Sequence, residues 1–488
     1  MAKPIMIQGT MSNAGKSFFA AGLCRIFMQD GYKCAPFKSQ NMALNSYITA
    51  DGHEIGRAQA MQAEAAGAEP SVLMNPVLLK PTTDVGSQVI VNGRPLGNMT
   101  ASEYFRNKKQ LIPQIKNVYD KLSTENDIIV IEGAGSPVEL NLLSDDIVNM
   151  GMAKIAESPV ILVGDIDRGG IFPQLLGTLD LFAPDERAMV KGLVVNKFRG
   201  DISLFESGTA ILEQRGGVDV LGVVPYIRCD IEDEDSLSVK LEKNKQSIVN
   251  IAVVKLPRMS NFTDFDVFSQ YDGVAVQYAA RCSELENADM IIIPGTKSTI
   301  SDMKWLRESG IEAMIKKCAQ KGTPVFGICG GFQMLGKSIS DPHNTEGGGS
   351  ISGMGMLDCK TVFNEEKTQV RTNGKFNDIE GTFGFLSGSR YEGYEIHMGE
   401  TMIGGNALLD KGGCVKDNVC GCYIHGIFDD EQVSEKIVKM LFEARGLQYM
   451  GGVTDRRKYK EQQFDILADA IRNSIDMAKV YDIIERGI

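Results

Sequence analysis

Short, almost continuously apolar runs recur along this chain of 488 residues, with helix-like stretches between them. Strands that alternate with helices predict a parallel sheet with helices on both faces, because a strand covered on both sides must be apolar on both sides. One series of runs ends near residue 228, and a second begins at residue 248. We therefore predict an α/β protein with two doubly wound, mainly parallel-sheet domains and a helical C-terminal tail.

The expected domains follow from these two series of apolar runs. They are residues 1–228, a charged linker at 229–247 that opens with a run of acids, residues 248–446, and a polar tail at 447–488. The expected strands are Pro4–Gln8, Lys33–Phe37, Ile128–Ile131, Val160–Val163, Gly192–Val195 and Val220–Val223, then Ile248–Lys255, Gly273–Tyr278, Met290–Pro294 and Thr323–Ile328. Arg390–Met398 and Val419–His425 are expected to be β-rich, and Glu431–Arg445 to form an amphipathic helix.

Composition excludes several classes of protein. A formal net charge of −12 argues against a nucleic-acid partner, which requires a basic surface. No run approaches the ~20 apolar residues of a membrane span, and the N-terminus lacks a signal-peptide pattern, so a cytoplasmic location is expected. The ten cysteines suggest no disulfide framework. Cys420-Gly421-Cys422 lacks the spacing of a zinc site and is better explained as buried strand residues. The oligomeric state is not fixed by the sequence.

A phosphate-binding loop follows the first apolar run. It reads Gly9-Thr10-Met11-Ser12-Asn13-Ala14-Gly15-Lys16-Ser17, with a helix-like stretch after it. Backbone N–H groups of Gly9, Thr10, Asn13, Ala14 and Gly15, together with the helix N-terminus, are expected to bind phosphate. Lys16 would reach the outer phosphates, and the Ser17 hydroxyl would bind Mg²⁺. ATP and Mg²⁺ are therefore the predicted cofactors, although Thr10 replaces the usual first glycine.

Polar residues end the strands that should border this loop. Because open α/β sheets bind ligands beyond the carboxyl ends of their strands, Glu132 is a predicted metal ligand. Asp165 and Asp167 either act in catalysis or cap the next helix. Asn196 either contacts the adenine or forms a turn.

A second chemical motif lies far downstream, where an apolar run delivers Cys329 into Gly330-Gly331. A thiol on a strand-to-helix turn is an exposed nucleophile, and the N–H groups of Gly330 and Gly295 are predicted to stabilise an oxyanion. His425, at the end of an apolar strand, is the predicted base. His397 is its competitor, and with Glu395 it forms either a substrate-binding pair or a packed ion pair. A phosphate site and a thiol nucleophile together predict ATP-driven amide formation from glutamine.

These motifs resemble known families. Gly327–Gly336 with His425 resembles the triad-type, class I glutamine amidotransferases, and the altered phosphate loop resembles that of the dethiobiotin-synthetase-like P-loop ATPases. His425 is followed by Gly-Ile-Phe rather than Pro and Glu, so the third triad member is not in its usual place, as in the cobyrinic and cobyric acid synthase branch. The stretches 37–46, 54–59 and 74–81, otherwise only polar loops, resemble the cobyric acid synthase family in particular.

The resemblance implies amidation of the b, d, e and g carboxylates of (adenosyl)cobyrinic acid a,c-diamide, with L-glutamine and ATP. It also implies that Lys38 contacts phosphate and that Glu54 is a second metal ligand. The residues expected to bind the corrinoid are Gln40, Asn41, Asn45, Arg57, Lys80 and Arg168. Three alternatives stay open: an a,c-diamide-forming synthase, a P-loop switch ATPase without synthetic activity, and a pseudo-amidotransferase that uses free ammonia.

Overall fold

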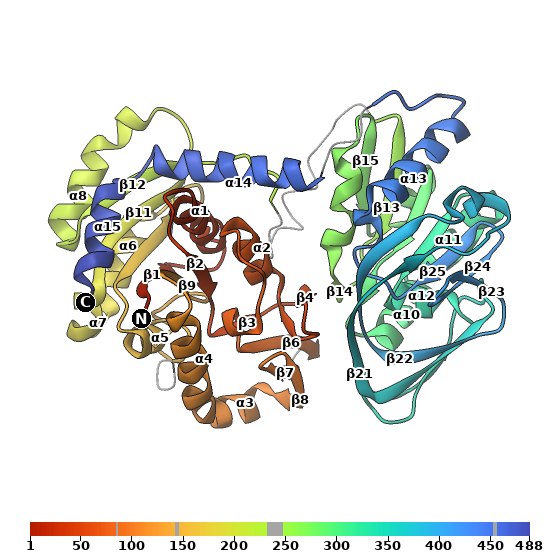
Figure 1. Ribbon diagram of the computed structural model, residues 1–488, viewed down its shortest axis with the longest axis horizontal. Helices are drawn as coiled ribbons and strands as arrows, with labels where there is room; N and C mark the ends of the chain where they lie inside the picture. Colours follow the sequence, from red (N-terminus) through yellow and green to blue (C-terminus); the bar gives the residue numbers. More distant parts are fainter. Residues whose placement is uncertain (84–85, 142–145, 232–246, 452–455) are drawn as a thin grey trace.

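The computed structural model describes residues 1–83, 86–141, 146–231, 247–451 and 456–488. The chain forms two units side by side, each built on a mainly parallel sheet (Figure 1). The predicted α/β class with two doubly wound sheets is confirmed. Among the described residues, no helix is both long and apolar enough to cross a membrane.

The N-terminal unit contains a six-stranded parallel sheet in the order β12-β11-β10-β1-β9-β2. Its strands are β1 (Lys3–Gly9), β2 (Cys34–Phe37), β9 (Ile128–Glu132), β10 (Val160–Asp165), β11 (Val190–Phe198) and β12 (Val220–Pro225). All six correspond to predicted runs. Neighbouring residues such as Ile5 and Met6 enter the cores on opposite faces of the sheet, which is why the runs are continuously apolar.

Helices cover both faces of this sheet. One face carries α1 (Lys16–Gln29), α2 (Arg57–Ala65), α14 (Arg456–Arg472) and α15 (Met477–Arg486). The other carries α4 (Ile112–Thr124), α5 (Met150–Ala156), α6 (Ile171–Leu181) and α8 (Glu206–Gly216), with α7 (Pro184–Met189) leading into β11. Figure 1 shows α14 running back from the second unit across the first.

The C-terminal segment is therefore helical, as predicted, but it is not a separate tail. Leu467 and Ile471 of α14 are buried against α1, in the same core as Phe19 and Phe27. Most of the predicted acidic linker, residues 232–246, lies outside the described residues. Ile231, at its start, is buried in that core as well.

An inserted sheet extends the N-terminal unit where sequence reasoning finds only polar loops. It has the order β3-β6-β7-β8 and lies beside the hairpin of β4 and β5. The bounds are β3 (Gln40–Met42), β4 (Ser46–Ile48), β5 (Glu54–Gly56), β6 (Val77–Thr83), β7 (Gly86–Val91) and β8 (Arg94–Thr100). The 3₁₀ segments η1 (Val72–Met74) and η2 (Lys108–Leu111), and α3 (Ala101–Asn107), complete the insertion.

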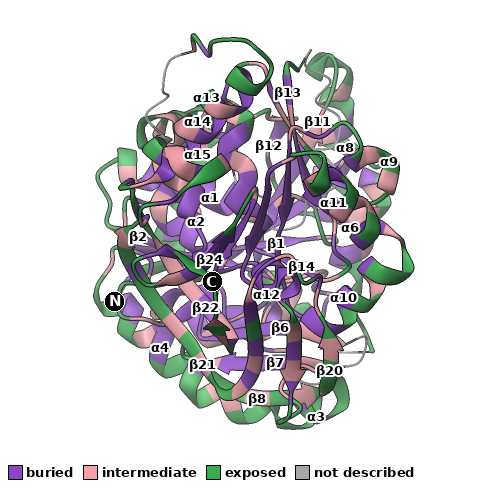
Figure 2. Cartoon of the chain, turned by 90° about the vertical axis from the view of Figure 1, so that its right-hand side faces the viewer, coloured by how far each residue is buried: buried purple, intermediate pink, exposed green. Residues whose placement is uncertain are grey.

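The C-terminal unit is built on a seven-stranded sheet in the order β15-β13-β16-β18-β25-β24-β23, of which the first five are parallel. These strands are β13 (Val249–Val254), β15 (Val274–Ala279), β16 (Met290–Ile293), β18 (Val325–Ile328), β23 (Asn406–Leu409), β24 (Gly412–Lys416) and β25 (Val419–Cys422). The helices are α9 (Cys282–Leu285), α10 (Thr299–Glu308), α11 (Ile311–Gln320), α12 (Gly330–Leu335) and α13 (Glu431–Ala444). The central strands of both units are buried (Figure 2).

The C-terminal unit also contains a second sheet and a short two-stranded pair. The second sheet has the order β20-β19-β21-β22, and β14 pairs with β17. Their bounds are β14 (Met259–Ser260), β17 (Gly295–Thr296), β19 (Ser338–Asp341), β20 (Gly349–Ser352), β21 (Cys359–Lys375) and β22 (Arg390–Ile403), with the 3₁₀ segments η6 (Phe262–Gln270), η7 (Gly381–Leu386) and η8 (Ile427–Asp429). Long strands β21 and β22 lie along the side of this unit that faces the first (Figure 1).

Candidate active sites

The loop between β1 and α1 forms a cradle. Gly15 has a φ of 94°, and a β-carbon there would lie 2.2 Å from the Asn196 amide nitrogen, so glycine is required. The Lys16 ammonium donates to the carbonyl oxygens of Met11 (3.0 Å) and Gly135 (3.1 Å). The ammonium group thus lies between the loop and the segment that follows β9, where it can meet the outer phosphates of a nucleotide.

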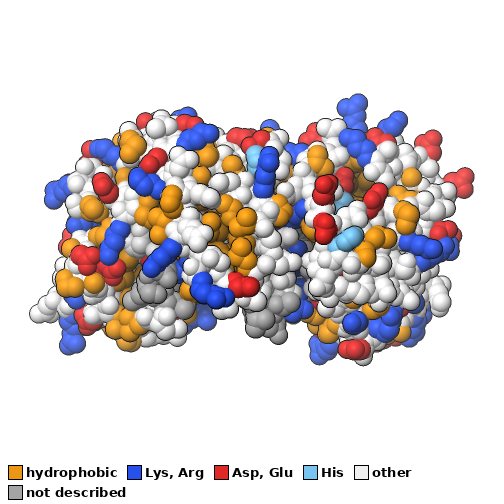
Figure 3. Space-filling view, turned by 90° about the horizontal axis from the view of Figure 1, so that it is seen from below, with side chains coloured by type: hydrophobic (Ala, Val, Ile, Leu, Met, Phe, Trp, Pro, Cys, Tyr) orange, Lys and Arg blue, Asp and Glu red, His pale blue; other side chains and the backbone are white. Residues whose placement is uncertain are grey.

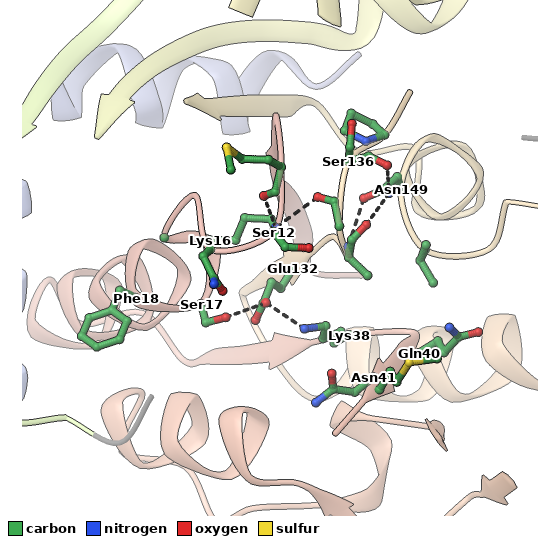
Figure 4. Close-up of a pocket in the computed structure, with 18 of the residues that line it drawn as sticks. Ser12, Lys16, Ser17, Phe18, Lys38, Gln40, Asn41, Glu132, Ser136 and Asn149 are labelled. Atoms are coloured by element: carbon green, nitrogen blue, oxygen red, sulfur yellow. Dashed lines mark hydrogen bonds and ion pairs between the residues drawn. The ribbon is translucent and has the colours of Figure 1, made fainter. Parts of the chain in front are cut away.

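Glu132, the last residue of β9, is the centre of a buried polar cluster beside this cradle (Figure 4). Its carboxylate accepts hydrogen bonds from Ser17 Oγ (2.8 Å), Lys38 Nζ (2.8 Å) and Gln62 Nε2 (2.6 Å). Burial raises the pKa of Glu132, but the Lys38 charge and the hydrogen bonds outweigh burial and hold it below its usual value. An anionic carboxylate beside the Ser17 hydroxyl fits Mg²⁺, which takes few protein ligands and the oxygens of phosphates.

The loops after β10 and β11 form the opposite rim. Asn196 donates from its amide to the carbonyl of Ala14 (2.9 Å), so it supports the cradle directly. Asp165 pairs with Lys197 (3.0 Å) and accepts the backbone N–H of Asp167 (2.9 Å). Asp165 does not cap the next helix, because the N-cap of α6 is Gly170 and has no side-chain cap. Its carboxylate instead shapes the turn that follows β10.

A cavity of about 1500 Å³ opens in front of the cradle. Predicted residues that line it are Thr10, Asn13, Gly15, Lys16, Ser17, Lys38, Gln40, Asn41, Glu132, Arg168 and Asn196. The inserted sheet and α3 supply an apolar wall that includes Met42, Leu79, Met99 and Phe105. Hydrophobic side chains also gather on the lower face of this unit (Figure 3). One cavity therefore joins a phosphate cradle to an apolar surface.

Other predicted residues lie outside this cavity. Gly9 and Ala14 belong to the cradle but do not line the cavity, and Asn45 and Arg57 lie beyond it. The Arg57 guanidinium lies 5.2 Å from the centre of the Tyr47 ring. Asn45 and Arg57 thus do not line this cavity, and their predicted contact with the corrinoid stays a prediction.

Glu54 and Lys80 also require correction. Glu54 is fully buried, with its carboxylate 2.8 Å from the Lys80 ammonium and 2.5 Å from that of Lys367. Burial raises the pKa of Glu54, but the two lysines outweigh it and hold the pKa far below its usual range. In the structure this carboxylate is paired with two ammonium groups, which argues against the prediction that it binds a metal. Lys80 is its counter-ion rather than a cavity residue.

Cys329 lies on the tight turn between β18 and α12. Its φ of 51° and ψ of −109° place a side-chain-bearing residue in a strained backbone conformation, as expected for a nucleophile on an elbow. At Gly331, two residues later, a β-carbon would lie 2.0 Å from the carbonyl oxygen of Ile293, so the turn packs too closely for any side chain. The thiol also lies 3.7 Å from the carbonyl oxygen of Ile396 on β22.

His425 interacts with this thiol and is oriented by Asp264. Its Nδ1 atom lies 2.6 Å from Asp264 Oδ2, and the Gly426 N–H donates to Asp264 Oδ1 (3.2 Å). Burial lowers the pKa of His425, but the Asp264 charge and the bonds to Asp264 and Cys329 outweigh burial and raise it to about 10. The structure therefore supplies the missing third member as Asp264.

The two predicted oxyanion donors lie at this site. A β-carbon on Gly295 would be 3.2 Å from His425 Cε1 and 3.6 Å from Cys329 Cβ. Gly330 packs against the backbone of Thr296, since a β-carbon on it would be 3.0 Å from the Thr296 nitrogen. Both glycines thus adjoin the thiol, as the oxyanion prediction requires.

The remaining histidine and cysteine motifs have structural roles. His397 Nε2 lies 3.0 Å from Glu395, its Nδ1 lies 2.7 Å from the carbonyl of Gly399, and its ring stacks on Tyr423. The structure thus favours a packed pair over a substrate-binding pair. Cys420 and Cys422 are buried in β25, and no group of three or more metal-ligating residues occurs in the part of the chain that the structure describes.

Comparison with known proteins separates the same two units. Residues 5–237 match a CobQ/CobB/MinD/ParA nucleotide binding domain, and residues 250–433 match a CobB/CobQ-like glutamine amidotransferase domain. Cobyric acid synthase of Ruminiclostridium cellulolyticum is 54% identical over 506 residues, with 100% of this chain and 98% of that protein covered. The enzymes of that name from Lachnoclostridium phytofermentans (53% over 513 residues) and Clostridium novyi (47% over 506 residues) match 100% of this chain and 100% and 99% of their own lengths.

The chain belongs to the cobyric acid synthase family. It is a glutamine-hydrolysing amidoligase with a nucleotide-binding unit, as the two motifs predicted. In this member of the cobyric acid synthase family, sequence reasoning finds Cys329 and His425 but not Asp264, which precedes His425 by 161 residues. Asp264 lies among aromatic residues in η6, and no local pattern marks it as a partner of histidine. Gln62, which holds Glu132 from α2, is missed for the same reason.

Proposed function

We propose that this chain converts (adenosyl)cobyrinic acid a,c-diamide to cobyric acid by amidating its b, d, e and g carboxylates, with ATP and L-glutamine as co-substrates. The observation that carries the proposal is the cavity of about 1500 Å³, in which a phosphate cradle faces an apolar wall. A corrinoid is a large, partly apolar macrocycle edged with carboxylates, so it needs both surfaces. The full-length similarity to cobyric acid synthases supports the same choice of substrate.

Carboxylate activation belongs to the N-terminal unit. A corrinoid carboxylate attacks the γ-phosphorus of ATP, and an acyl phosphate and ADP result. Lys16 and Lys38 offset the charge of the transferring phosphoryl group. Ser17 and Glu132 would hold Mg²⁺, which when bound shields the phosphate oxygens. Arg168 and the amides of Gln40 and Asn41 line the cavity where the acidic and amide side chains of the substrate would lie.

Ammonia is produced in the C-terminal unit. His425 takes the proton of the Cys329 thiol, the sulfur attacks the amide carbon of glutamine, and the N–H groups of Gly295 and Gly330 stabilise the oxyanion. The His425 imidazolium, held by Asp264, donates a proton to the departing ammonia. Water then releases glutamate from the thioester, and ammonia displaces phosphate from the acyl phosphate to form the amide.

The location and partners follow from this chemistry. All ten cysteines are free thiols, and both ATP and reduced thiols are characteristic of the cytoplasm, where we place the enzyme. Its partners are the corrinoid and glutamine, and we assign it no nucleic-acid or membrane partner.

A mass-spectrometric time course with cobyrinic acid a,c-diamide, ATP, Mg²⁺ and glutamine tests the proposal. We expect successive mass decreases, one for each exchange of a carboxyl hydroxyl for an amino group at the b, d, e and g positions. Amidation of cobyrinic acid itself, with no reaction of the a,c-diamide, would identify the a,c-diamide-forming synthase instead. No amidation of either substrate would favour a P-loop switch.

A further inference from the structure

The two units meet at a reciprocal pair of asparagine contacts. The Ser46 N–H at the start of β4 donates to the side-chain oxygen of Asn261 (3.1 Å), and the Phe262 N–H donates to the side-chain oxygen of Asn45 (3.3 Å). Each asparagine thus binds the backbone of the residue that follows the other. All four residues are buried, so water does not replace these hydrogen bonds.

These contacts lead directly to the histidine of the glutaminase site. The Asp264 N–H donates to the carbonyl of Asn261 (3.1 Å), and the Asp264 carboxylate holds His425. Tyr394 donates from its hydroxyl to the carbonyl of Ser46 (3.2 Å), and its ring stacks on His425 with centres 5.4 Å apart. Tyr394 and His425 also exchange two backbone hydrogen bonds (2.9 and 3.1 Å). Two chains of direct contact therefore run from Ser46 to His425.

Ser46 ends a segment, residues 38–46, whose other end lies at the phosphate site. Residues 38–46 begin at Lys38, whose ammonium binds Glu132 (2.8 Å), and pass Gln40 on the cavity wall. They end at Ser46, whose hydroxyl accepts a hydrogen bond from Lys80 (3.0 Å). The single short segment 38–46 thus contacts both the Glu132 carboxylate and the residues that hold His425.

We propose that Asn45 and Ser46 are positioning residues for glutamine hydrolysis. By holding Asn261 and Tyr394, they fix the Asp264–His425 pair opposite Cys329, and the 38–46 segment links this placement to occupancy of the phosphate site. Coupling of this kind needs a contiguous physical connection and a measured energy, and the contacts above supply the connection. The inference rests on the glutaminase half of the proposed function, whereas synthesis from ammonium salts tests the other half separately.

Two variants test the inference through glutamate release. Asn261→Gly keeps the left-handed backbone (φ 51°) while it removes the acceptor for Ser46, and Tyr394→Phe removes only a hydroxyl. We expect each to lower glutaminase kcat by about three- to tenfold, the effect of one buried hydrogen bond, and to leave ammonia-supported synthesis unchanged. The limb of the glutaminase pH profile that reports His425 should move to lower pH, because Asp264 is held less firmly.

The matched control is Asn98→Ala. Asn98 donates to the carbonyl of Thr345 (3.4 Å) and so also joins the two units, but at an exposed position without contact to Asp264 or His425. We expect glutaminase activity equal to wild type. The double variant with Asn45→Ala and Asn261→Gly should lower glutaminase kcat by less than the product of the two single fold-losses. The reason is that both substitutions break the same reciprocal pair.

Three results would overturn the inference. The first is wild-type glutaminase kcat and pH profile in both Asn261→Gly and Tyr394→Phe. The second is full additivity of Asn45→Ala and Asn261→Gly. The third is an equal loss of ammonia-supported synthesis, because the contact would then support the whole fold rather than the histidine.

Discussion

At the scale of single residues, Cys329 divides the reaction into two halves. Replacing it with serine removes the nucleophile, so Cys329→Ser should abolish synthesis from glutamine. Synthesis from ammonium salts should persist, since the cradle around Lys16 and Glu132 is untouched. Assays with each nitrogen source, on the same preparation, check this. Undiminished glutamine-dependent synthesis in Cys329→Ser would mean that Cys329 is not the nucleophile. A wild-type enzyme that uses ammonium salts but not glutamine would be a pseudo-amidotransferase.

Glu132 is expected to be needed for the other half of the reaction, ATP-dependent synthesis. Glu132→Gln removes the anion that Lys38 and Ser17 surround, so ATP-dependent synthesis should fall by about 10²–10³-fold, a typical loss for one electrostatic group. Basal glutaminase activity should remain. Asp167→Asn is the control: this carboxylate pairs with Arg199 at the surface (2.7 Å), and the variant should keep near wild-type synthesis. Equal losses in the two variants would contradict the assignment of Glu132.

The Asp264–His425 pair predicts a pH-dependent contribution to stability. The folded protein raises the pKa of His425 from 6.5 to about 10, so folding favours proton uptake at this site. The stabilisation is fully present below about pH 6.5 and is lost as pH rises through about 10. Asp264→Asn should therefore lower the free energy of unfolding most at the acidic end, and the difference from wild type should shrink toward pH 10. A difference that does not vary with pH in urea titrations would contradict this account.

The sequence predicts those functional residues that lie within a recognisable local pattern of strand, turn and helix. Cys329 and the phosphate loop stand on turns between an apolar strand and a helix, and Glu132 ends an apolar strand. The partners of Asp264 and Glu54 could not be predicted in this way. Only the three-dimensional fold brings Asp264 to His425, or places Lys80 and Lys367 on either side of Glu54.

At the scale of secondary-structure elements, the central strands are predictable because they are apolar on both faces. The inserted strands β3–β8 are not, because they are short or partly exposed and carry polar residues. The polar composition of residues 447–488 predicts a helical tail, but it does not predict that α14 has a buried face or which sheet that face covers. Its place on the N-terminal sheet is therefore a result of the structure alone.

The role of α14 can be measured with two isoleucines on the same helix. Ile471 is 1% exposed and packs beside Gly22 of α1, whereas Ile466 is 45% exposed. Ile471→Ala should lower the free energy of unfolding of the N-terminal unit by about 2–5 kcal/mol, as for other buried isoleucines. Ile466→Ala should have little effect in the same chemical denaturation experiment. Similar effects of the two substitutions would mean that α14 is a loosely attached tail.

At the scale of the whole molecule, two units of different chemistry share a buried polar boundary. Asn45, Ser46 and Glu54 of the first unit bind Phe262, Asn261 and Lys367 of the second. Such buried hydrogen bonds and ion pairs keep the units in one arrangement, because separating them would leave polar groups without their partners. The thiol site and the phosphate cavity can therefore act on one reaction.

The most direct test of the central claim follows the nitrogen atom. Glutamine with a heavy isotope in its amide is supplied with ATP, Mg²⁺ and cobyrinic acid a,c-diamide, together with excess unlabelled ammonium. The new corrinoid amides should carry the heavy isotope, and Cys329→Ser should incorporate only unlabelled nitrogen. Unlabelled amides from the wild-type enzyme would show that ammonia from solution is the nitrogen donor, and would contradict transfer from Cys329 to the acyl phosphate.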